Sequence, residues 1–385
     1  MTPSARLQAA IELLDQVIAA ARDDGAAADT LIARYFAERR YAGSKDRRAV
    51  RDLVYRAVRA FGEPPTSGRA VMVALARRDG ELAVLFDGSR HAPAMITPDE
   101  PAAEPSLIPA WIEPLLAAPV DEDECRALLD RAPLHVRVNA LRTTRDALLA
   151  RWPEAEPIPA TAHGLSLPEG TNIEADGLAE VQDAGSQIIA AACEARSGMT
   201  VLDLCAGAGG KTLALASDMG GEGRLIAADT VRDRLARLVP RAQRAGATVE
   251  TRLLNPNREA EVLADLAAAC DVVLVDAPCS GSGTWRRNPE ARWRLTPERL
   301  DRIVALQSRL LDVAAPPVKS GGRLVFAVCS LIDREGRGQA EAFLERHSGW
   351  RSVPPNSAQC HGPGTLLLPR RDNTDGFFFA VLEKA

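Results

Sequence analysis

The segment 201-VLDLCAGAGGKT-212 decides the fold, because an apolar run is followed by a glycine cluster and then by Lys211 and Thr212. A glycine turn that joins a buried strand to a helix is typical of nucleotide-binding sites. A phosphate-binding loop needs glycine where Cys205 stands, and the dinucleotide pattern needs a third glycine where Thr212 stands. The segment therefore predicts a strand–turn–helix unit without a seat for a pyrophosphate.

Apolar runs alternate with helix-length segments from about residue 180 to the C-terminus. These runs are 200-TVLDLC-205, 224-RLIAAD-229, 249-VETRLL-254, 271-DVVLVDA-277, 323-RLVFAVC-329 and 377-FFFAVLE-383. Near-continuous apolar strands separated by helices indicate a parallel, doubly wound sheet. The fold class expected for 181–385 is therefore α/β, with a Rossmann-like domain.

The chain before this domain has a different pattern. Helical spacing predicts helices over 5–21, from Thr30 as an N-cap, through 46–61 and over 68–80, so an all-helical N-terminal domain is expected over 1–87. A Pro- and Ala-rich connector is expected over 88–120 and a small α+β module over 121–180.

Composition limits the functional classes. The 385 residues are 46% apolar and 26% charged, which fits a soluble protein of more than one domain. The N-terminus lacks an apolar signal core and no apolar run reaches the length of a membrane span, so we expect a cytoplasmic protein without a membrane partner. A monomer is expected. Seven cysteines without a CxxC pair and five scattered histidines predict no metal site.

Charge is uneven along the chain, although the net charge is only −5. The segment 38–59 gathers the basic residues Arg39, Arg40, Lys45, Arg47, Arg48, Arg51, Arg56 and Arg59. A local basic face can bind nucleic-acid phosphates whatever the total charge, and an ordinary solvated helix surface explains the same pattern equally well.

An acidic residue follows the glycine turn at a sequence spacing that points to a bound nucleoside. Asp229 ends the second strand about twenty residues after the glycines, where a carboxylate commonly accepts hydrogen bonds from ribose hydroxyls. A nucleoside ligand without a pyrophosphate points to S-adenosylmethionine, whose methionine part needs close approach to the backbone. The alternative is a purely structural turn.

Two cysteines follow the ends of core strands, Cys279 within 276-DAPCSGSG-283 and Cys329 before Ser330. A lone cysteine there is usually a small apolar residue, but a pair suits methylation of a pyrimidine at C5. A thiolate that adds to C6 makes C5 nucleophilic, an acid such as Asp276 can bond the N3 edge, and the thiol is finally eliminated. The residues alone leave open which cysteine attacks, because DNA cytosine methyltransferases use the Pro-Cys cysteine.

Together these segments resemble the RsmB-like (NOP/Sun) family of RNA 5-methylcytosine methyltransferases. The resemblance covers roughly 130–385 and rests on PLHVRVNAL (133–141), VQDAGSQ (181–187), VLDLCAGAGGKT, DAPCSGSGTWRRNPE, FAVCS and TDGFFFA (374–380). The segment 5–60, which includes GSKDRR, resembles the N-terminal helices of bacterial members more weakly.

The resemblance implies roles for individual residues. Cys329 would attack C6 and Cys279 would assist release, while Lys211 reaches the base pocket and Asp276 pairs with the cytosine. The cofactor S-adenosylmethionine would be held by Cys205, Ala206, Gly207, Ala208, Gly209, Gly210, Lys211, Asp229, Arg234, Asn255 and Asp276. Asn255 replaces a usual acidic residue near the adenine, so altered adenine contacts are expected, and Ala208 replaces a common proline.

The expected partner is RNA. Ribosomal RNA is favoured over tRNA, because the extra N-terminal helices could hold a larger structured target. A methyltransferase of another substrate class and a non-catalytic RNA-binding assembly factor are the alternatives. The segment 283-GTWRRNPEARWR-294 mixes arginines with Trp285 and Trp293, which suits single-stranded RNA, or else a surface loop with one buried Trp.

Overall fold

The computed structural model describes residues 1–353 and 359–385. Contacts group the chain into two compact units. Unit 1 contains Met1–Asp130 and Thr284–Thr296, and unit 2 contains Arg131–Gly283 and Pro297–Ala385. A short segment from the second half of the sequence therefore belongs to the N-terminal unit.

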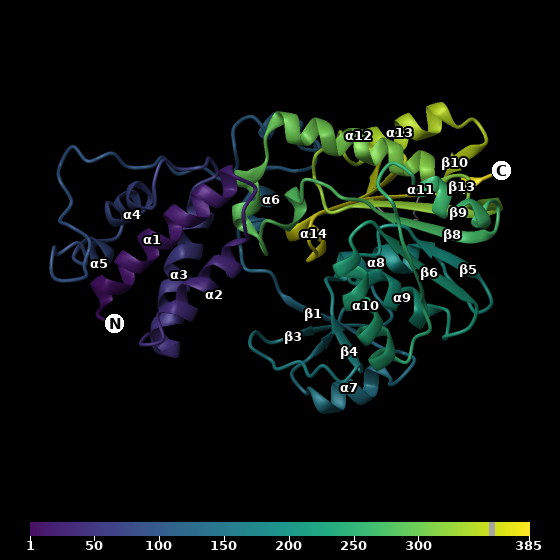
Figure 1. Cartoon of the computed structure of the whole chain (residues 1–385), viewed down its shortest axis with the longest axis horizontal. Coiled ribbons are helices and arrows are strands. Elements are labelled where there is room, and N and C mark those ends of the chain that lie inside the picture. Colours follow the sequence, from purple (N-terminus) through teal and green to yellow (C-terminus); the bar gives the residue numbers. More distant parts are fainter. Residues whose placement is uncertain (354–358) are drawn as a thin grey trace. The chain divides into compact units, whose positions relative to one another are not determined.

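Unit 1 is built from helices around one apolar core (Figure 1). Its elements are α1 (Pro3–Arg22), α2 (Ala28–Glu38), α3 (Ser44–Ala60), α4 (Gly68–Ala76), α5 (Gly80–Ala83), η1 (Glu113–Leu115), α6 (Glu122–Ala127) and η4 (Pro289–Arg294). Helix α1 begins after Thr2, whose hydroxyl accepts a hydrogen bond from the Ala5 N–H, and with proline at its first position. The helices expected over 5–21, 46–61 and 68–80 correspond to α1, α3 and α4.

The start of α2 differs from the prediction that Thr30 caps it. The helix begins at Ala28, and the preceding Ala27 has no side-chain cap. The carboxylate of Glu290 accepts the Ala28 N–H at 3.2 Å instead. Because this acceptor lies 262 residues away in the chain, local sequence could not show it.

The segment that contains Arg292 and Trp293 is not an exposed RNA-binding loop, so that prediction is wrong for these residues. Arg292 is 1% exposed, and its guanidinium donates to the carbonyls of Val58 and Phe61 at the end of α3. The Trp293 indole N–H also donates to Phe61 O, at 2.8 Å. An unpaired buried carbonyl costs about 1–3 kcal/mol, so these side chains stabilise the end of α3.

Trp285 and Arg286 of the same segment are buried too, and Arg294 donates to the carbonyls of Gly25 and Ala26. The alternative interpretation, a surface loop with one buried Trp, is also wrong, because Trp285 and Trp293 are both buried.

Unit 2 begins with a small antiparallel sheet of strand order β2-β3-β1-β4. Its elements are β1 (Leu134–Val138), α7 (Arg145–Arg151), β2 (Glu156–Pro157), β3 (Gly164–Leu167) and β4 (Ala179–Val181). Alternate residues Val136 and Val138 of β1 are fully buried and form a core with Leu148 of α7 and Leu165 of β3. Residues 121–130, which were expected to belong to an α+β module over 121–180, lie in unit 1 with α6.

Over the described residues, the larger sheet of unit 2 has nine strands in the order β11-β12-β13-β9-β8-β5-β6-β7, with β10 paired to β13. Its strands are β5 (Thr200–Asp203), β6 (Arg224–Asp229), β7 (Glu250–Leu253), β8 (Cys270–Asp276), β9 (Val318–Val328), β10 (Trp350–Ser352), β11 (Cys360–His361), β12 (Gly364–Leu367) and β13 (Phe377–Lys384). The helical elements that accompany them are α8 (Ala184–Ala192), α9 (Gly210–Asp218), α10 (Arg232–Ala245), α11 (Glu259–Val262), η2 (Ala264–Leu266), η3 (Ser282–Thr284), α12 (Pro297–Ala314), α13 (Arg337–Arg346) and α14 (Pro369–Asp372).

Helices cover both faces of this sheet, with α8, α9 and α10 on one side and α12 and α13 on the other (Figure 1). Strands β9, β8, β5, β6 and β7 are parallel, so the doubly wound, Rossmann-like fold is confirmed. Strand β13 runs antiparallel to β9, and β12 and β10 pair antiparallel with β13. A buried strand is apolar in either direction, so sequence could not reveal this reversal.

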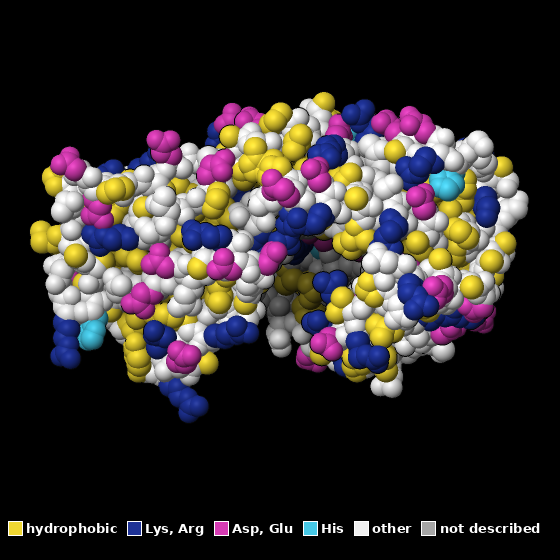
Figure 2. All heavy atoms as spheres, turned by 45° about the horizontal axis from the view of Figure 1, so that its top comes forward, with side chains coloured by type: hydrophobic (Ala, Val, Ile, Leu, Met, Phe, Trp, Pro, Cys, Tyr) yellow, Lys and Arg dark blue, Asp and Glu magenta, His cyan; other side chains and the backbone are white. Residues whose placement is uncertain are grey.

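The surface carries both signs of charge. On the face shown in Figure 2, Lys and Arg side chains alternate with Asp and Glu side chains. Within α3, Lys45 and Arg48 are exposed, whereas Arg51 pairs with Asp29 at 3.1 Å. Among the described residues, no helix combines the length and the apolar character needed to cross a membrane.

Candidate active site

Four neighbouring parallel strands bring the predicted residues to one edge of the sheet. Strand β5 leads into the glycine turn, β6 ends at Asp229, β8 ends at Asp276, and Cys329 follows β9 directly. The order β9-β8-β5-β6 makes these ends adjacent. The structure therefore gathers groups that are up to 124 residues apart, from Cys205 to Cys329, at the edge where such sheets bind ligands.

The turn between β5 and α9 depends on glycine. Gly207 and Gly209 have φ angles of 57° and 88°, in the left-handed region. A Cβ on Gly209 would also collide with the side chain of Leu238. Around Gly207 the space is open, since a Cβ there would meet nothing within 4 Å. The backbone at Gly207 is therefore accessible for close approach by a ligand.

Asp229 holds this turn in place. Its Oδ2 accepts the Gly207 N–H at 2.9 Å and its Oδ1 accepts the Val231 N–H at 2.7 Å. The residue is 6% exposed. Because each carboxylate oxygen has a second lone pair, Asp229 can still accept hydrogen bonds from a ligand.

Arg234 and Asn255 lie beside this acid and are exposed. Arg234 is in the first turn of α10, after Asp229. Asn255 follows β7, in which Leu253 is the register partner of Asp229. The structure brings both residues to the Asp229 end of the site and away from the cysteines in the order of strands.

Lys211 and Asp276 form an ion pair, with Nζ and Oδ2 2.7 Å apart. The lysine side chain is 9% exposed and the aspartate side chain 33%. Burial alone lowers the pKa of Lys211, but Asp276 outweighs it and the pKa lies above its usual value. A charged ammonium thus holds a carboxylate that remains partly open to solvent.

Cys279 and Cys329 are in direct contact, with their Sγ atoms 3.2 Å apart. The hydrogen bond with Cys329, together with burial, raises the pKa of Cys279 well above its usual value. Cys279 therefore keeps its proton at neutral pH, and either sulfur can be the donor in this contact. Burial also raises the pKa of Cys205, whose thiol is thus unsuited to attack.

Sequence reasoning missed several groups that support this site. Asp203, 1% exposed, accepts the Thr212 hydroxyl at 2.7 Å and so ties the end of β5 to α9. Arg241 binds Ala208 O at 2.5 Å. Gln182 donates to Gly210 O at 3.1 Å. Gln182 and Asp203 lie inside quoted motifs, so their polarity within apolar surroundings was an available signal, whereas Arg241 on α10 had none.

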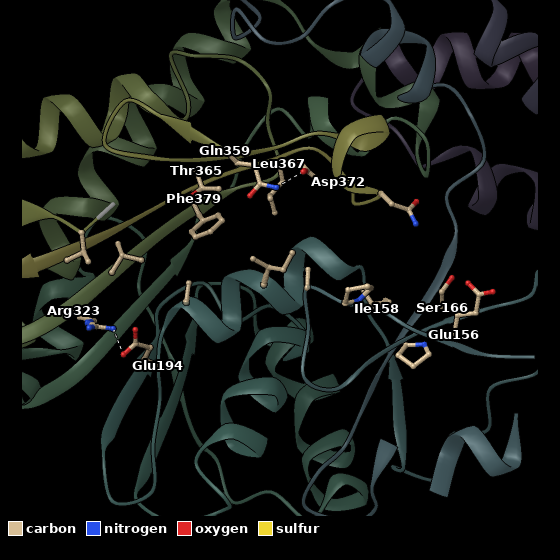
Figure 3. Close-up of a pocket in the computed structure, with 18 residues that line it drawn as sticks. Glu156, Ile158, Ser166, Glu194, Arg323, Gln359, Thr365, Leu367, Asp372 and Phe379 are labelled. Atoms are coloured by element: carbon tan, nitrogen blue, oxygen red, sulfur yellow. Dashed lines mark hydrogen bonds and ion pairs between the residues drawn. The ribbon is translucent and has the colours of Figure 1, made fainter. Parts of the chain in front are cut away.

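Unit 2 also has a cavity elsewhere. It has a volume of about 810 Å³, and residues of α8, β12 and β13 contribute to its lining, with Glu156 and Ser166 on the far side (Figure 3). None of the predicted site residues lines it. Within the described part of the chain, no cluster of His, Cys, Asp and Glu is arranged to hold a metal ion.

The model of the family "16S rRNA methyltransferase RsmB/F" matches residues 190–383, just over half of the chain. The chain belongs to this family. The RsmB/F assignment confirms the resemblance seen in the sequence, and it is consistent with an enzyme of the methyltransferase class that uses S-adenosylmethionine.

Relatives of the RsmB/F chain agree with the assignment. A probable ribosomal RNA small subunit methyltransferase B of Synechocystis is 36% identical over 69% of this chain and 63% of its own length. A ribosomal RNA small subunit methyltransferase B of Sodalis glossinidius is 31% identical over 78% of this chain and 71% of its own. The match thus spans less than two thirds of the Synechocystis relative.

A solved structure named PH0851 covers 100% of this chain and 99% of its own, with a TM-score of 0.77 and 22% identity. This likeness supports the fold of the RsmB/F chain.

Asp203 provides a pH-dependent prediction. Burial raises its pKa to about 7, although Thr212 counteracts part of the rise. Because the folded-state pKa exceeds the unfolded one, the stability that protonated Asp203 provides is complete below about pH 4. It is lost as the pH rises to about 7. The free energy of unfolding of the parent protein, compared with that of Asp203→Asn, should therefore decrease as the pH rises from about 4 to about 7. The decrease should be at most ~1.4 kcal/mol per pH unit.

Urea unfolding of the parent protein and of Asp203→Asn at a series of pH values measures the difference in their free energies of unfolding. A difference that stays constant from pH 5 to pH 7 would contradict the burial of an ionisable Asp203.

Proposed function

We propose that this protein is an S-adenosylmethionine-dependent RNA cytosine-C5 methyltransferase that acts on ribosomal RNA of the small subunit. The observation that carries the proposal is the contact of Cys279 with Cys329, beside the Lys211–Asp276 pair. The names of the Synechocystis and Sodalis relatives support the choice of ribosomal RNA over tRNA.

The residues present fit the cofactor. The open backbone at Gly207 and the remaining lone pairs of Asp229 suit a nucleoside with an amino-acid tail. Arg234 and Asn255 would lie towards its adenosine part, and the segment Cys205–Lys211 would contact the tail. When bound, S-adenosylmethionine supplies a methyl group on a positively charged sulfur, which a carbon nucleophile can take.

Cytosine C5 becomes such a nucleophile only after addition at C6. Cys329 Sγ would form the S–C6 bond, and the electron pair of the C5–C6 double bond would move towards N3. Asp276 would hydrogen-bond the base edge, with Lys211 holding it and supplying positive charge to the ring that gains electrons. After transfer, solvent water would accept the C5 proton and the Cys329 thiolate would leave C6, which restores the aromatic ring.

The two cysteines would divide this work. Because only a thiolate adds to C6, the raised pKa of Cys279 makes Cys329 the better candidate for attack. A protonated Cys279 next to the adduct is suited to the elimination half of the reaction. The target base would have to leave its stack to reach them.

RNA would also contact the exposed basic residues of α3. Lys45 and Arg48 are exposed on this helix. Phosphate contacts of this kind depend on salt but carry no base specificity. The position of the target within the RNA would therefore come from elsewhere in the site.

The cofactor assignment predicts that Asp229→Ala weakens S-adenosylmethionine binding about ten- to a hundred-fold, because charge-assisted hydrogen bonds of about 1.5–3 kcal/mol are lost. Calorimetry measures the affinity. Asp233→Ala, at an exposed acid in the same turn, is the matched control. Equal affinity of a folded Asp229→Ala variant and the control would remove Asp229 from the cofactor site.

The RNA surface predicts that Lys45→Glu with Arg48→Glu lowers RNA affinity and reduces its salt dependence, without changing cofactor affinity. Filter binding at several salt concentrations measures both. Reversal of two exposed arginines outside α3, Arg22→Glu with Arg78→Glu, is the control. If the α3 double variant and the control double variant bind RNA with the same affinity, the basic surface of α3 is solvated and does not bind RNA.

The cysteine roles predict opposite outcomes for two variants. Cys329→Ala should abolish methyl transfer while still binding cofactor. Cys279→Ala should attack and methylate, then stall as a covalent protein–RNA adduct that survives denaturing electrophoresis. The double variant should form no adduct. An adduct from Cys329→Ala and none from Cys279→Ala would exchange the roles, and full activity of both single variants would exclude a covalent mechanism.

A further inference from the structure

Glu335 is buried behind the two cysteines and is not part of the reaction described above. It lies between β9 and α13, six residues after Cys329, and is 0% exposed. Within the described residues, no basic side chain forms an ion pair with it. A buried carboxylate without a counter-ion is costly unless hydrogen-bond donors surround it.

Donors from two loops meet this carboxylate. Oε1 accepts the backbone N–H of Ser280 at 2.7 Å and the amide of Gln307 at 3.0 Å. Oε2 accepts the hydroxyl of Ser330 at 2.6 Å and also the hydroxyl of Ser280. The carboxylate thereby joins the loop after β8, the loop after β9 and helix α12.

The two serines are the immediate neighbours of the two cysteines. Ser280 follows Cys279, and Ser330 follows Cys329. A displacement of either serine would therefore be passed directly to a reacting sulfur. Since the sulfurs are only 3.2 Å apart, their alignment is sensitive to small shifts of either loop.

Further hydrogen bonds reinforce the same connection. Ser282 Oγ lies 3.0 Å from Ser330 Oγ and accepts the Leu331 N–H at 2.9 Å. Gln307, which donates to Glu335, also donates to Pro278 O at 2.9 Å. The residues before and after Cys279 are thus both held by groups that contact Glu335.

The charge of Glu335 acts on the proton of the cysteine pair. It adds to the rise in the pKa of Cys279, after the larger effects of the Cys329 hydrogen bond and of burial. Lys211, whose Nζ pairs with Asp276 Oδ2 at 2.7 Å, is within electrostatic range of Cys329. The negative charge of Glu335 near Cys279 favours the protonated thiol there.

We propose that Glu335 is a positioning residue that holds both cysteine loops and disfavours the thiolate of Cys279, so that Cys329 is the sulfur that attacks. This inference rests on the proposed function. Glu335 contacts neither sulfur directly, so its action passes through Ser280, Ser330 and its electric field.

Glu335→Gln separates charge from shape. The glutamine keeps an oxygen for the Ser280 N–H, and its amide can donate to the serine hydroxyls, which act as donors or acceptors. The negative charge is lost. Glu345→Gln, at an exposed glutamate on α13, is the matched control.

The test is alkylation of the full-length protein by iodoacetamide at neutral pH, with the rate at each cysteine read by peptide mass spectrometry. In the parent protein, Cys329 should react faster than Cys279. In Glu335→Gln, the ratio of these rates should fall about tenfold, the change expected for one pKa unit, while Glu345→Gln keeps the parent ratio. A Glu335→Gln ratio within twofold of the parent ratio overturns the proposal.

Glu335→Ala removes the hydrogen bonds of the carboxylate as well as its charge, so it tests the structural connection between the two loops. It should lower the rate of methyl transfer more than Glu335→Gln does, with unchanged affinity for S-adenosylmethionine. Equal rates for the two variants overturn the positioning role. Alkylation needs neither RNA nor cofactor, so a parent protein that methylates no RNA would refute the proposed function and leave the alkylation result to decide on Glu335.

Discussion

The parallel pairing of β8 with β9 is the constraint on which the site depends. Asp276 at the end of β8 stands opposite Ala327 in β9, so both strands end at the same level. Cys279 and Cys329 then leave the sheet at neighbouring points, and their sulfurs come into contact. A shift of this register would also point every buried side chain of one strand to the opposite face, so the apolar core fixes the position of the chemistry.

Under the proposed function, the same arrangement would let one sheet edge bind two kinds of ligand. Strands β5 and β6 end in a glycine turn and Asp229, which suit a nucleoside, whereas β8 and β9 end in groups that suit a pyrimidine base. Lys211 starts on the cofactor turn but pairs with Asp276 on the base side. This ion pair therefore connects the cofactor half of the site with the catalytic half.

Local patterns in the sequence were sufficient for much of this account. The strands from β5 to β9, the glycine turn, Asp229 and the two cysteines are each visible as an apolar run or a short motif. Long-range partners were not visible. Glu290 completes the start of α2, Arg292 binds the end of α3, and β13 reverses direction, because each depends on residues that only folding brings together.

Glu335 belongs to the same class, since its importance lies in contacts with Ser280 and Ser330 and not in a motif of its own. The central claim is that the assembled edge methylates cytosine in RNA. It is tested most directly by incubating the protein with tritiated S-adenosylmethionine and small-subunit ribosomal RNA, then digesting the RNA and separating its nucleosides. The account predicts that the label is found in 5-methylcytidine, and label in another nucleoside or in protein alone would contradict it.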